Sequence, residues 1–402
     1  MTSREVNNRD YSALGVTKIV GVMGSGMIGS NPYEENAWSG SSRYFFRECD
    51  RRGFLHRAFG VEVENAYKVP LMVHNFSFNR DRWRQKFYLD TRYYDLLSNR
   101  IAELLSSEDL RWPVLQIGGI YNLKPIIRSQ MPVYSYHDGN LAQAIRSPYF
   151  ARGIRKSHLQ KALDYEKNVY GNLDMIFTMS EYLRDSFIND FQIEAGRVKA
   201  IGAGVNLDAI PMVSRKDYEK KEIVFVGVDF NRKGGMDVLR AFKSAREIYP
   251  DARLNVIGPK KLAIPSGYAS GVVHHGFLSK KEPAQKQKFE RIMNDSVLFV
   301  LPSLYEPFGI AALEAMLYQM PCILTNAWAF PEMVKPGVNG ELVKPGDEKE
   351  LAEKIISLLK YPEKLQEMGT AGRELVLSKY TWRHVVSNLI ESIPISVTAT
   401  KG

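Results

Sequence analysis

Two glutamates, Glu306 and Glu314, lie eight residues apart where a polar turn joins a hydrophobic strand to an Ala- and Leu-rich helix. Carboxylates repel an anion but accept hydrogen bonds from neutral hydroxyls. Backbone amides at the start of a helix can instead hold phosphate, here those of Phe308, Gly309 and Ile310. The stretch therefore predicts a site for a long ligand that carries both hydroxyls and phosphate, and a nucleotide-sugar is long enough.

The residues Glu306-Pro307-Phe308-Gly309, with the second glutamate at position 314, resemble the signature of family 4 of the retaining nucleotide-sugar glycosyltransferases. The resemblance implies an α/β chain with the GT-B fold, in which two Rossmann-like domains face each other across a cleft that holds the active site. It also implies that Glu306 contacts the donor sugar and Glu314 the nucleotide ribose. On the residues alone, an ordinary βα unit with two solvated glutamates stays open.

A second group of suitable residues follows the strand predicted at 222–227. Arg232 and Lys233 could neutralise a diphosphate and its leaving-group charge without metal, although loop cations are common. The resembled family has Gly-Arg here, with Lys-Gly five residues after that arginine. Lys233-Gly234 match, but Val228 stands where the arginine is expected. We predict that Arg232 takes the place of the missing cation.

Three glycines, Gly24, Gly26 and Gly29, follow the first predicted strand in a Gly-x-Gly-x-x-Gly pattern. A dinucleotide site needs such glycines to open a helix directly, but the polar loop 30–40 intervenes. A dinucleotide oxidoreductase is therefore a weak alternative, which titration with NADH would decide. The family resemblance implies instead that this loop faces the donor phosphates and the acceptor.

Two histidines complete the candidate site. His137 ends a predicted strand, where it could bind a sugar hydroxyl or transfer a proton, and a structural histidine is the alternative. The resembled family commonly has a sugar-contacting histidine near this position. His275 with Gly276 loosely resembles the family's base-binding edge.

Strands and helices alternate along most of the chain, with strands expected at 61–63 and 71–73 among others. The charged segment 212–221 is typical of an interdomain linker. We therefore expect an acceptor-side domain over 1–212 and a donor domain over 213–380. The resemblance implies that the C-terminal helix, 381–402, crosses back onto the first domain.

Composition narrows the class of protein. The 402 residues, 45% of them hydrophobic, allow two or three globular domains. Cys49 and Cys322 are far apart and lack metal-ligand spacing, and no Asp-x-Asp pair occurs, so we expect neither disulfide nor metal cofactor. No apolar run is long enough for a membrane span, which favours a cytoplasmic enzyme.

The net charge of +9 fits an anionic substrate, an anionic lipid surface or nucleic acid, but no nucleic-acid module pattern is visible. Its densest cationic and aromatic segment is 80–88. A helix with a solvated basic face is the commoner explanation, and a membrane-surface or acceptor-binding element is the alternative. A peripheral contact with the inner face of the membrane therefore stays open.

The resemblance implies transfer of a sugar from a nucleotide donor to the hydroxyl of a sugar, glycan or lipid-linked acceptor, with retained anomeric configuration. Glu306, Lys233, Arg232 and His137 would serve catalysis. A catalytically weak or non-catalytic GT-B partner, or a membrane-associated binding protein, is the alternative. The donor sugar, the base, the acceptor, the linkage and the oligomeric state stay open.

Overall fold

The computed structural model describes residues 18–24, 31–34, 37–127, 131–213 and 216–393. The chain divides into two compact units. Unit 1 contains the residues up to Gly204 and those from Trp382 onward, and unit 2 runs from Val205 to Thr381. The divisions thus fall at 204/205 and 381/382, whereas the sequence placed them after residues 212 and 380.

Unit 1 contains a six-stranded parallel sheet with the order β2-β1-β3-β4-β5-β6. Its strands are β1 (Ile19–Gly24), β2 (Leu55–Val61), β3 (Val114–Ile117), β4 (Val133–His137), β5 (Met175–Thr178) and β6 (Val198–Ala200). All residues of β1, β3 and β4 are buried. Such continuous burial is expected of parallel strands, because helices cover both faces of the sheet.

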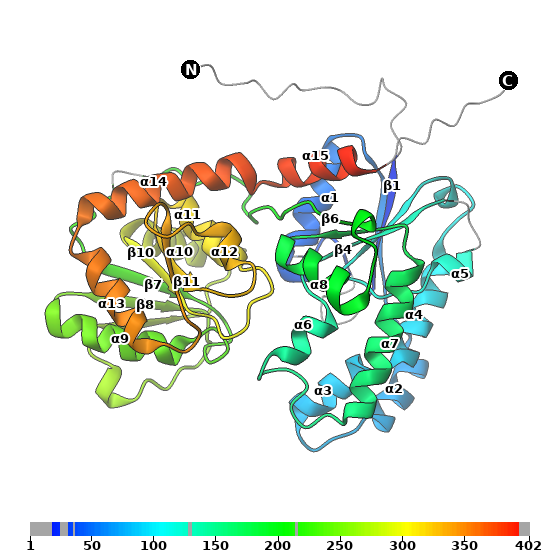
Figure 1. Cartoon of the computed structure of the whole chain (residues 1–402), viewed down its shortest axis with the longest axis horizontal. Helices are drawn as coiled ribbons and strands as arrows, with labels where there is room; N and C mark the ends of the chain where they lie inside the picture. The colour runs from blue at the N-terminus through cyan, green and yellow to red at the C-terminus, as the bar shows by residue number, and fades with distance from the viewer. Residues whose placement is uncertain (1–17, 25–30, 35–36, 128–130, 214–215, 394–402) are drawn as a thin grey trace. The chain divides into compact units, whose positions relative to one another are not determined.

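The helices of unit 1 pack around this sheet (Figure 1). They are α1 (Ser41–Arg51), α2 (Asn65–His74), α3 (Arg80–Tyr88), α4 (Thr91–Leu104), α5 (Lys124–Ile127), α6 (Leu141–Arg146), α7 (Lys156–Asn172), α8 (Glu181–Phe191) and α15 (Trp382–Ser392), with short 3-10 turns η2 (Ala37–Gly40), η3 (Asp109–Arg111) and η4 (Ala195–Arg197). The side chains of Asn79, Asp90, Asn140 and Ser180 cap α3, α4, α6 and α8. The C-terminal α15 packs on α1, where the rings of Trp382 and Phe45 lie 6.0 Å apart.

One sequence prediction for unit 1 is wrong. Residues 71–73, expected as a strand, lie in helix α2, and the strand expected at 61–63 is instead β2, which ends at Val61. The apolar run Leu71-Met72-Val73 looked like a short buried strand, but only Leu71 is buried. Short apolar runs do not distinguish a strand from a helix by periodicity alone.

Unit 2 contains a second six-stranded parallel sheet, with the order β12-β11-β10-β7-β8-β9. Its strands are β7 (Glu222–Val226), β8 (Arg253–Ile257), β9 (Val272–Gly276), β10 (Leu298–Leu301), β11 (Cys322–Thr325) and β12 (Gly340–Val343). The chain builds outward from β7 on one side and from β10 on the other, and these two strands pair in parallel at Ile223 and Leu298. Ligands of doubly wound sheets bind beyond the strand ends at such a switch point.

Helices cover this sheet too (Figure 1). They are α9 (Gly235–Ile248), α10 (Pro283–Asp295), α11 (Ile310–Leu317), α12 (Phe330–Met333), α13 (Glu348–Leu359) and α14 (Pro362–Lys379), with a 3-10 turn η5 (Ser266–Tyr268). Part of the predicted linker packs on unit 2. The Lys216 amine donates to the carbonyls of Met293 and Ser296, and the Tyr218 hydroxyl donates to that of Gln319.

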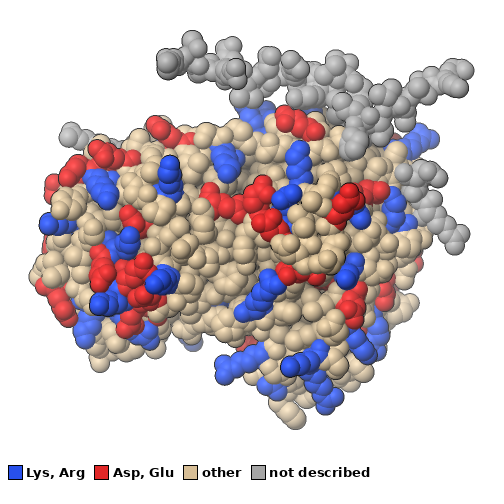
Figure 2. All heavy atoms as spheres, viewed as in Figure 1, with Lys and Arg blue, Asp and Glu red and all other residues tan. Residues whose placement is uncertain are grey.

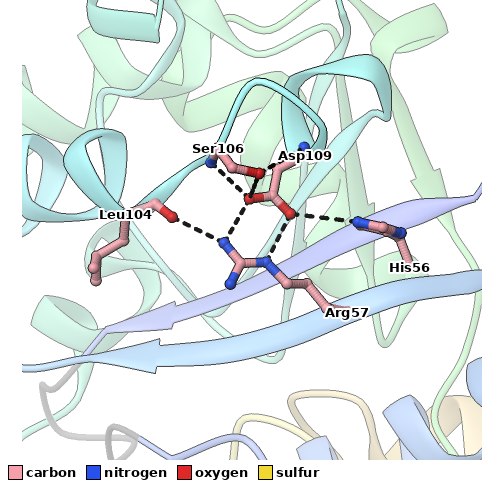
Figure 3. Close-up of polar contacts among 5 residues, drawn as sticks. All are labelled: His56, Arg57, Leu104, Ser106 and Asp109. Atoms are coloured by element: carbon pink, nitrogen blue, oxygen red, sulfur yellow. Dashed lines mark hydrogen bonds and ion pairs between the residues drawn. The ribbon is translucent and has the colours of Figure 1, made fainter.

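A polar network ties β2 to the segment that precedes β3 (Figure 3). The Arg57 guanidinium donates two hydrogen bonds to Asp109, at 2.6 and 2.5 Å, and a third to the Leu104 carbonyl. The Ser106 amide and hydroxyl also donate to Asp109, and the His56 ring lies 3.6 Å away. Burial alone raises the pKa of Asp109, but the bonds from Arg57 and Ser106 outweigh it and hold the pKa below its ordinary value of 3.8.

We predict that Asp109→Asn destabilises unit 1 by about 1–3 kcal/mol at neutral pH, because it removes a buried carboxylate that accepts several hydrogen bonds. The lowered pKa means that this stabilisation is present above the unfolded-state pKa and is lost as the pH falls through the folded-state value. The calorimetric unfolding midpoint of the variant should therefore lie below that of wild type at pH 7, and the difference should be much smaller at about pH 3. Glu103→Gln is the matched control, because the Arg100–Glu103 pair is solvent-exposed. Equal unfolding midpoints for Asp109→Asn and wild type at pH 7 would contradict the assignment.

Gly234, in the loop after β7, packs directly against the loop after β10. It adopts a φ of +74°, and a Cβ there would lie 2.2 Å from the Pro302 carbonyl oxygen. Only glycine satisfies both the left-handed backbone and this close approach.

We therefore predict that Gly234→Ala lowers the unfolding midpoint of unit 2 more than either of two control substitutions. Gly337→Ala carries only the cost of a positive φ, about 1–2 kcal/mol, because no atom lies within 4 Å of a Cβ there. Gly267→Ala carries neither the backbone cost nor a steric clash. Calorimetry of the three variants separates the cost of the positive φ from the cost of the steric clash. A Gly234→Ala midpoint equal to that of Gly337→Ala would show that the loops are not in tight contact.

Candidate active site

The loops after β7 and β10 meet at the switch point of unit 2. The Leu304 amide donates to the Arg232 carbonyl at 2.9 Å, and the Arg232 guanidinium donates to the Tyr305 carbonyl at 2.8 Å. Beside these bonds the Lys233 amine forms an ion pair with the Glu306 carboxylate. The structure thus brings together three of the sequence-predicted residues, Arg232, Lys233 and Glu306.

The Lys233–Glu306 pair is shielded from water. The two side chains are 14% and 9% exposed, and the Ser303 hydroxyl lies 3.4 Å from the same Glu306 oxygen. Burial, followed by the neighbouring Arg232 guanidinium, lowers the pKa of Lys233 to about 7. The adjacent Glu306 carboxylate opposes this shift, because a nearby anion favours the charged amine.

Helix α11 begins next to this pair. Its N-cap, Gly309, has a φ of +97°, and a Cβ there would lie 2.4 Å from the Phe330 ring. Among described residues, the amides of Phe308, Gly309 and Ile310 find no acceptor. Free amides and the positive end of the helix dipole suit an anion. The Phe308 side chain itself is buried, so its contribution to the site is its backbone.

Glu314, in the second turn of α11, has a partner that the sequence analysis missed. The Lys280 amine donates to both of its carboxylate oxygens, at 2.7 and 2.8 Å, and lies 5.1 Å from the Phe289 ring. Glu314 is 7% exposed. A carboxylate has about four acceptor positions, so two remain for hydroxyl groups. The Lys280-Lys281 pair was the only signal in the sequence, and nothing in its spacing linked it to Glu314.

Among the described contacts, none joins His275 to Lys233, Glu306 or Glu314. Its Nε2 lies 2.9 Å from the Asn255 side-chain oxygen, and the Asn255 amide donates to Glu222 at the first residue of β7. Burial, with Lys288 and His274 nearby, lowers the pKa of His275 to about 4. It is therefore a neutral ring in a side-chain network of the sheet, and its base-binding role stays a prediction.

Val228, at the position of the expected arginine, is 64% exposed. Arg232 also pairs with Asp229, with Nε 3.2 Å from the carboxylate. The proposal that Arg232 replaces the missing cation stays a prediction.

In unit 1, Gly24 ends β1 at the switch point between β1 and β3. Its amide donates to the Tyr121 hydroxyl at 2.7 Å, and that hydroxyl lies 3.3 Å from the Gly24 carbonyl. Gln116 of β3 fixes Tyr121 through both of its backbone groups. Gly26 and Gly29 lie outside the described residues. Tyr121, which sequence reasoning missed, thus anchors the start of the glycine-rich loop.

His137 ends β4, as the sequence predicted, but its side chain lies in the core. Its side chain is 2% exposed, with ring centroids 5.5 Å from Tyr170 and 5.2 Å from Phe187. The strand-end residue turns inward onto α7 and α8, and burial lowers its pKa to about 3. At neutral pH the ring is therefore neutral, with one N–H donor and one acceptor nitrogen. Its sugar-binding and proton-transfer roles stay predictions.

The described part of the chain contains no cluster of three or more metal-ligating side chains. Cys49 and Cys322 are buried free thiols. Among the described helices, none is both long and apolar enough to span a bilayer.

Part of the chain matches a known protein family. Residues 208–375 match the family model described as glycosyl transferases group 1. Alpha-maltose-1-phosphate synthase of Mycolicibacterium smegmatis is 25% identical over 251 residues, 56% of this chain and 64% of that protein. The first curated relatives that the chain matches are covered over 50–64% of their length.

Solved structures extend the likeness to both units. Sucrose-phosphate synthase from Thermosynechococcus elongatus has a TM-score of 0.66 at 16% identity, over 93% of this chain and 98% of that one. Anabaena HepE in complex with UDP and glucose has a TM-score of 0.62 at 17% identity, over 94% and 99%. These likenesses concern the fold. Two parallel six-stranded sheets with flanking helices, together with these structural matches, show that this chain has the GT-B fold, and residues 208–375 match the family model of the glycosyl transferases group 1.

Proposed function

We propose that the chain is a retaining glycosyltransferase that moves a sugar from a nucleotide-diphosphate donor to an acceptor hydroxyl, in glycan, polysaccharide or glycolipid synthesis. The observation that carries the proposal is the buried Lys233–Glu306 pair at the switch point of unit 2, beside the free amides of α11. The group 1 family match over the same unit supports it.

The charges of the site suit a diphosphate leaving group. The α11 amides and the Lys233 amine would bind the phosphates, and Arg232 would add a second cation. A fixed cation in a dry site stabilises the charge that develops in the transition state more than it stabilises the ground state. Binding of an anion would also favour the protonated form of Lys233, whose pKa is lowered to about 7 by burial and by Arg232. These cations could do the work of a metal ion, so we propose that transfer needs none.

The two glutamates would bind the two ends of the donor. Glu306 would accept a hydrogen bond from a hydroxyl of the donor sugar, and Glu314 would accept from the ribose with Lys280 holding its carboxylate in place. HepE was solved with UDP and glucose, which makes uridine diphosphate sugars the first donors to test. The acceptor loop would be the glycine-rich segment after Gly24.

A non-catalytic GT-B partner is the second candidate, and the exposed Val228 in place of a cation is the observation that favours it. The two candidates differ in turnover. A panel of UDP-, GDP- and ADP-sugars, assayed for nucleotide release in the presence of EDTA, separates them. Loss of activity with EDTA that magnesium or manganese restores would overturn the metal-independent proposal.

If the chain is catalytic as proposed, we predict that substitution of Glu306 and of Glu314 affects different kinetic constants. Glu306→Gln should reduce kcat about 10- to 100-fold, because a hydrogen bond to the reacting sugar contributes about 1–3 kcal/mol. Glu314→Gln should chiefly raise KM for the donor. Steady-state kinetics with the preferred donor measures both, with calorimetric unfolding as the check on folding. Wild-type kinetics in both variants across all accepted donors would show that the site is elsewhere.

We also predict that Lys280 is a positioning residue for nucleotide binding. Lys280→Met should weaken binding of the nucleoside diphosphate about tenfold, because Glu314 would face an anionic ligand without compensating charge. Its effect on kcat should be small. Lys286→Met, which breaks the exposed Lys286–Glu290 pair, is the matched control. Tighter binding in Lys280→Met would mean that the lysine blocks the carboxylate instead of positioning it.

A further inference from the structure

Helix α2 of unit 1 carries an apolar face with no partner among the described residues. Ala66, Val69 and Val73 recur at helical spacing on its outer side and are exposed, Val69 by 51% and Val73 by 70%. The turn after α2 continues this surface with Phe76, 52% exposed, and Phe78, 98% exposed. A fully exposed phenylalanine beside an apolar helix face is costly in water and marks an interaction surface.

The apolar surface is held in place. The Phe78 and Phe76 rings lie 5.2 Å apart, and the Phe76 and Trp83 rings lie 5.7 Å apart. The Trp83 ring N–H donates to the Met72 carbonyl at 2.8 Å, which joins α3 to α2. The aromatic tip is therefore a fixed part of the α2–α3 hairpin.

Positive side chains surround this tip. Arg80, Arg82 and Arg84 of α3 are exposed, and the segment after α6 adds further exposed cations beside them. A Cβ on Gly153 would lie 2.6 Å from Arg82 Nη2, and the Ala151 amide donates to Gln85 at 2.8 Å. Together the basic cluster is Arg80, Arg82, Arg84, Arg152, Arg155 and Lys156. Figure 2 shows Lys and Arg gathered at this end of unit 1.

No member of the basic cluster forms an ion pair with a described residue. Other arginines of the same unit behave differently, because Arg57 and Arg92 pair with Asp109 and Asp90. The two segments that carry the cluster, 80–88 and 147–156, contain a single acidic residue, Asp81. Its charge is therefore available to an external anion.

We propose that the α2–α3 hairpin docks on an anionic lipid bilayer, with Phe78, Phe76 and the outer face of α2 in the headgroup region and the basic cluster on the lipid phosphates. An anionic membrane surface favours this combination, because it buries the apolar side chains and attracts the unpaired cations. Binding of nucleic acid would leave the aliphatic face of α2 exposed. A protein partner would need an acidic group opposite each cation. The surface lies in unit 1 and does not depend on the catalytic proposal.

Co-sedimentation with vesicles tests this docking on the full chain. One set of vesicles contains phosphatidylcholine alone, and the other contains about 30% phosphatidylglycerol. We expect binding to the second set that weakens in about 0.5 M salt. Arg80→Gln/Arg82→Gln/Arg84→Gln should weaken partition about 100-fold, since each surface cation contributes roughly fivefold. Phe78→Ser should weaken it about tenfold.

Matched controls separate the hairpin from the general attraction of a +9 chain. Lys344→Gln/Lys349→Gln/Lys360→Gln removes the same charge from exposed lysines of unit 2, and Ile248→Ser removes an apolar side chain that is 58% exposed. Both should bind like wild type. Equal loss in the two charge variants, no effect of Phe78→Ser, or no binding to either vesicle overturns the proposal. Binding of a duplex oligonucleotide that Phe78→Ser leaves intact, without vesicle binding, would assign the cluster to nucleic acid instead.

Discussion

The candidate site depends on the contact between the loops after β7 and β10. A lysine amine and a carboxylate, each mostly removed from water, lose solvation that only a close partner restores. Lys233 and Glu306 are such partners, and they can meet because Gly234 lets the two backbones approach. The strand order places both loops at the switch point, so the same contact that compensates two buried charges also places polar groups beside the amides of α11.

Most of this site could be predicted from the sequence because its signals are local. The turn from β10 into α11, Glu306, Gly309 and the amides that follow occupy one short stretch, and Lys233-Gly234 occupy another. Alternating strands and helices were enough to infer a doubly wound fold, because parallel strands need crossover helices. Spacing alone could not show that Lys233 would touch Glu306. That pairing follows from the order of strands in the sheet.

The features that the sequence could not reveal depend on contacts between distant residues. Tyr121 reaches Gly24 across 97 positions, and Lys280 reaches Glu314 across 34. His137 was read as a strand-end polar group, but α7 and α8 cover it, and no local pattern encodes that packing. Residues 71–73 of α2 were read as a strand for a related reason. Only part of this apolar run is buried, because Val73 is 70% exposed, so hydrophobicity and burial do not coincide there. The exposed face is the feature for which we propose a partner.

Under the proposed function, Arg232 would give the diphosphate a second cation although Val228 stands where the family has an arginine. A guanidinium has five N–H donors and keeps its charge at any physiological pH. Arg232 uses its Nη1 on the Tyr305 carbonyl and its Nε on Asp229, which holds the side chain beside Lys233 while other donors remain. The Arg232 charge also contributes to the lowered pKa of Lys233, because the two cations repel each other. A diphosphate between them would relieve that repulsion, because it favours the charged form of the lysine and accepts from the free arginine donors.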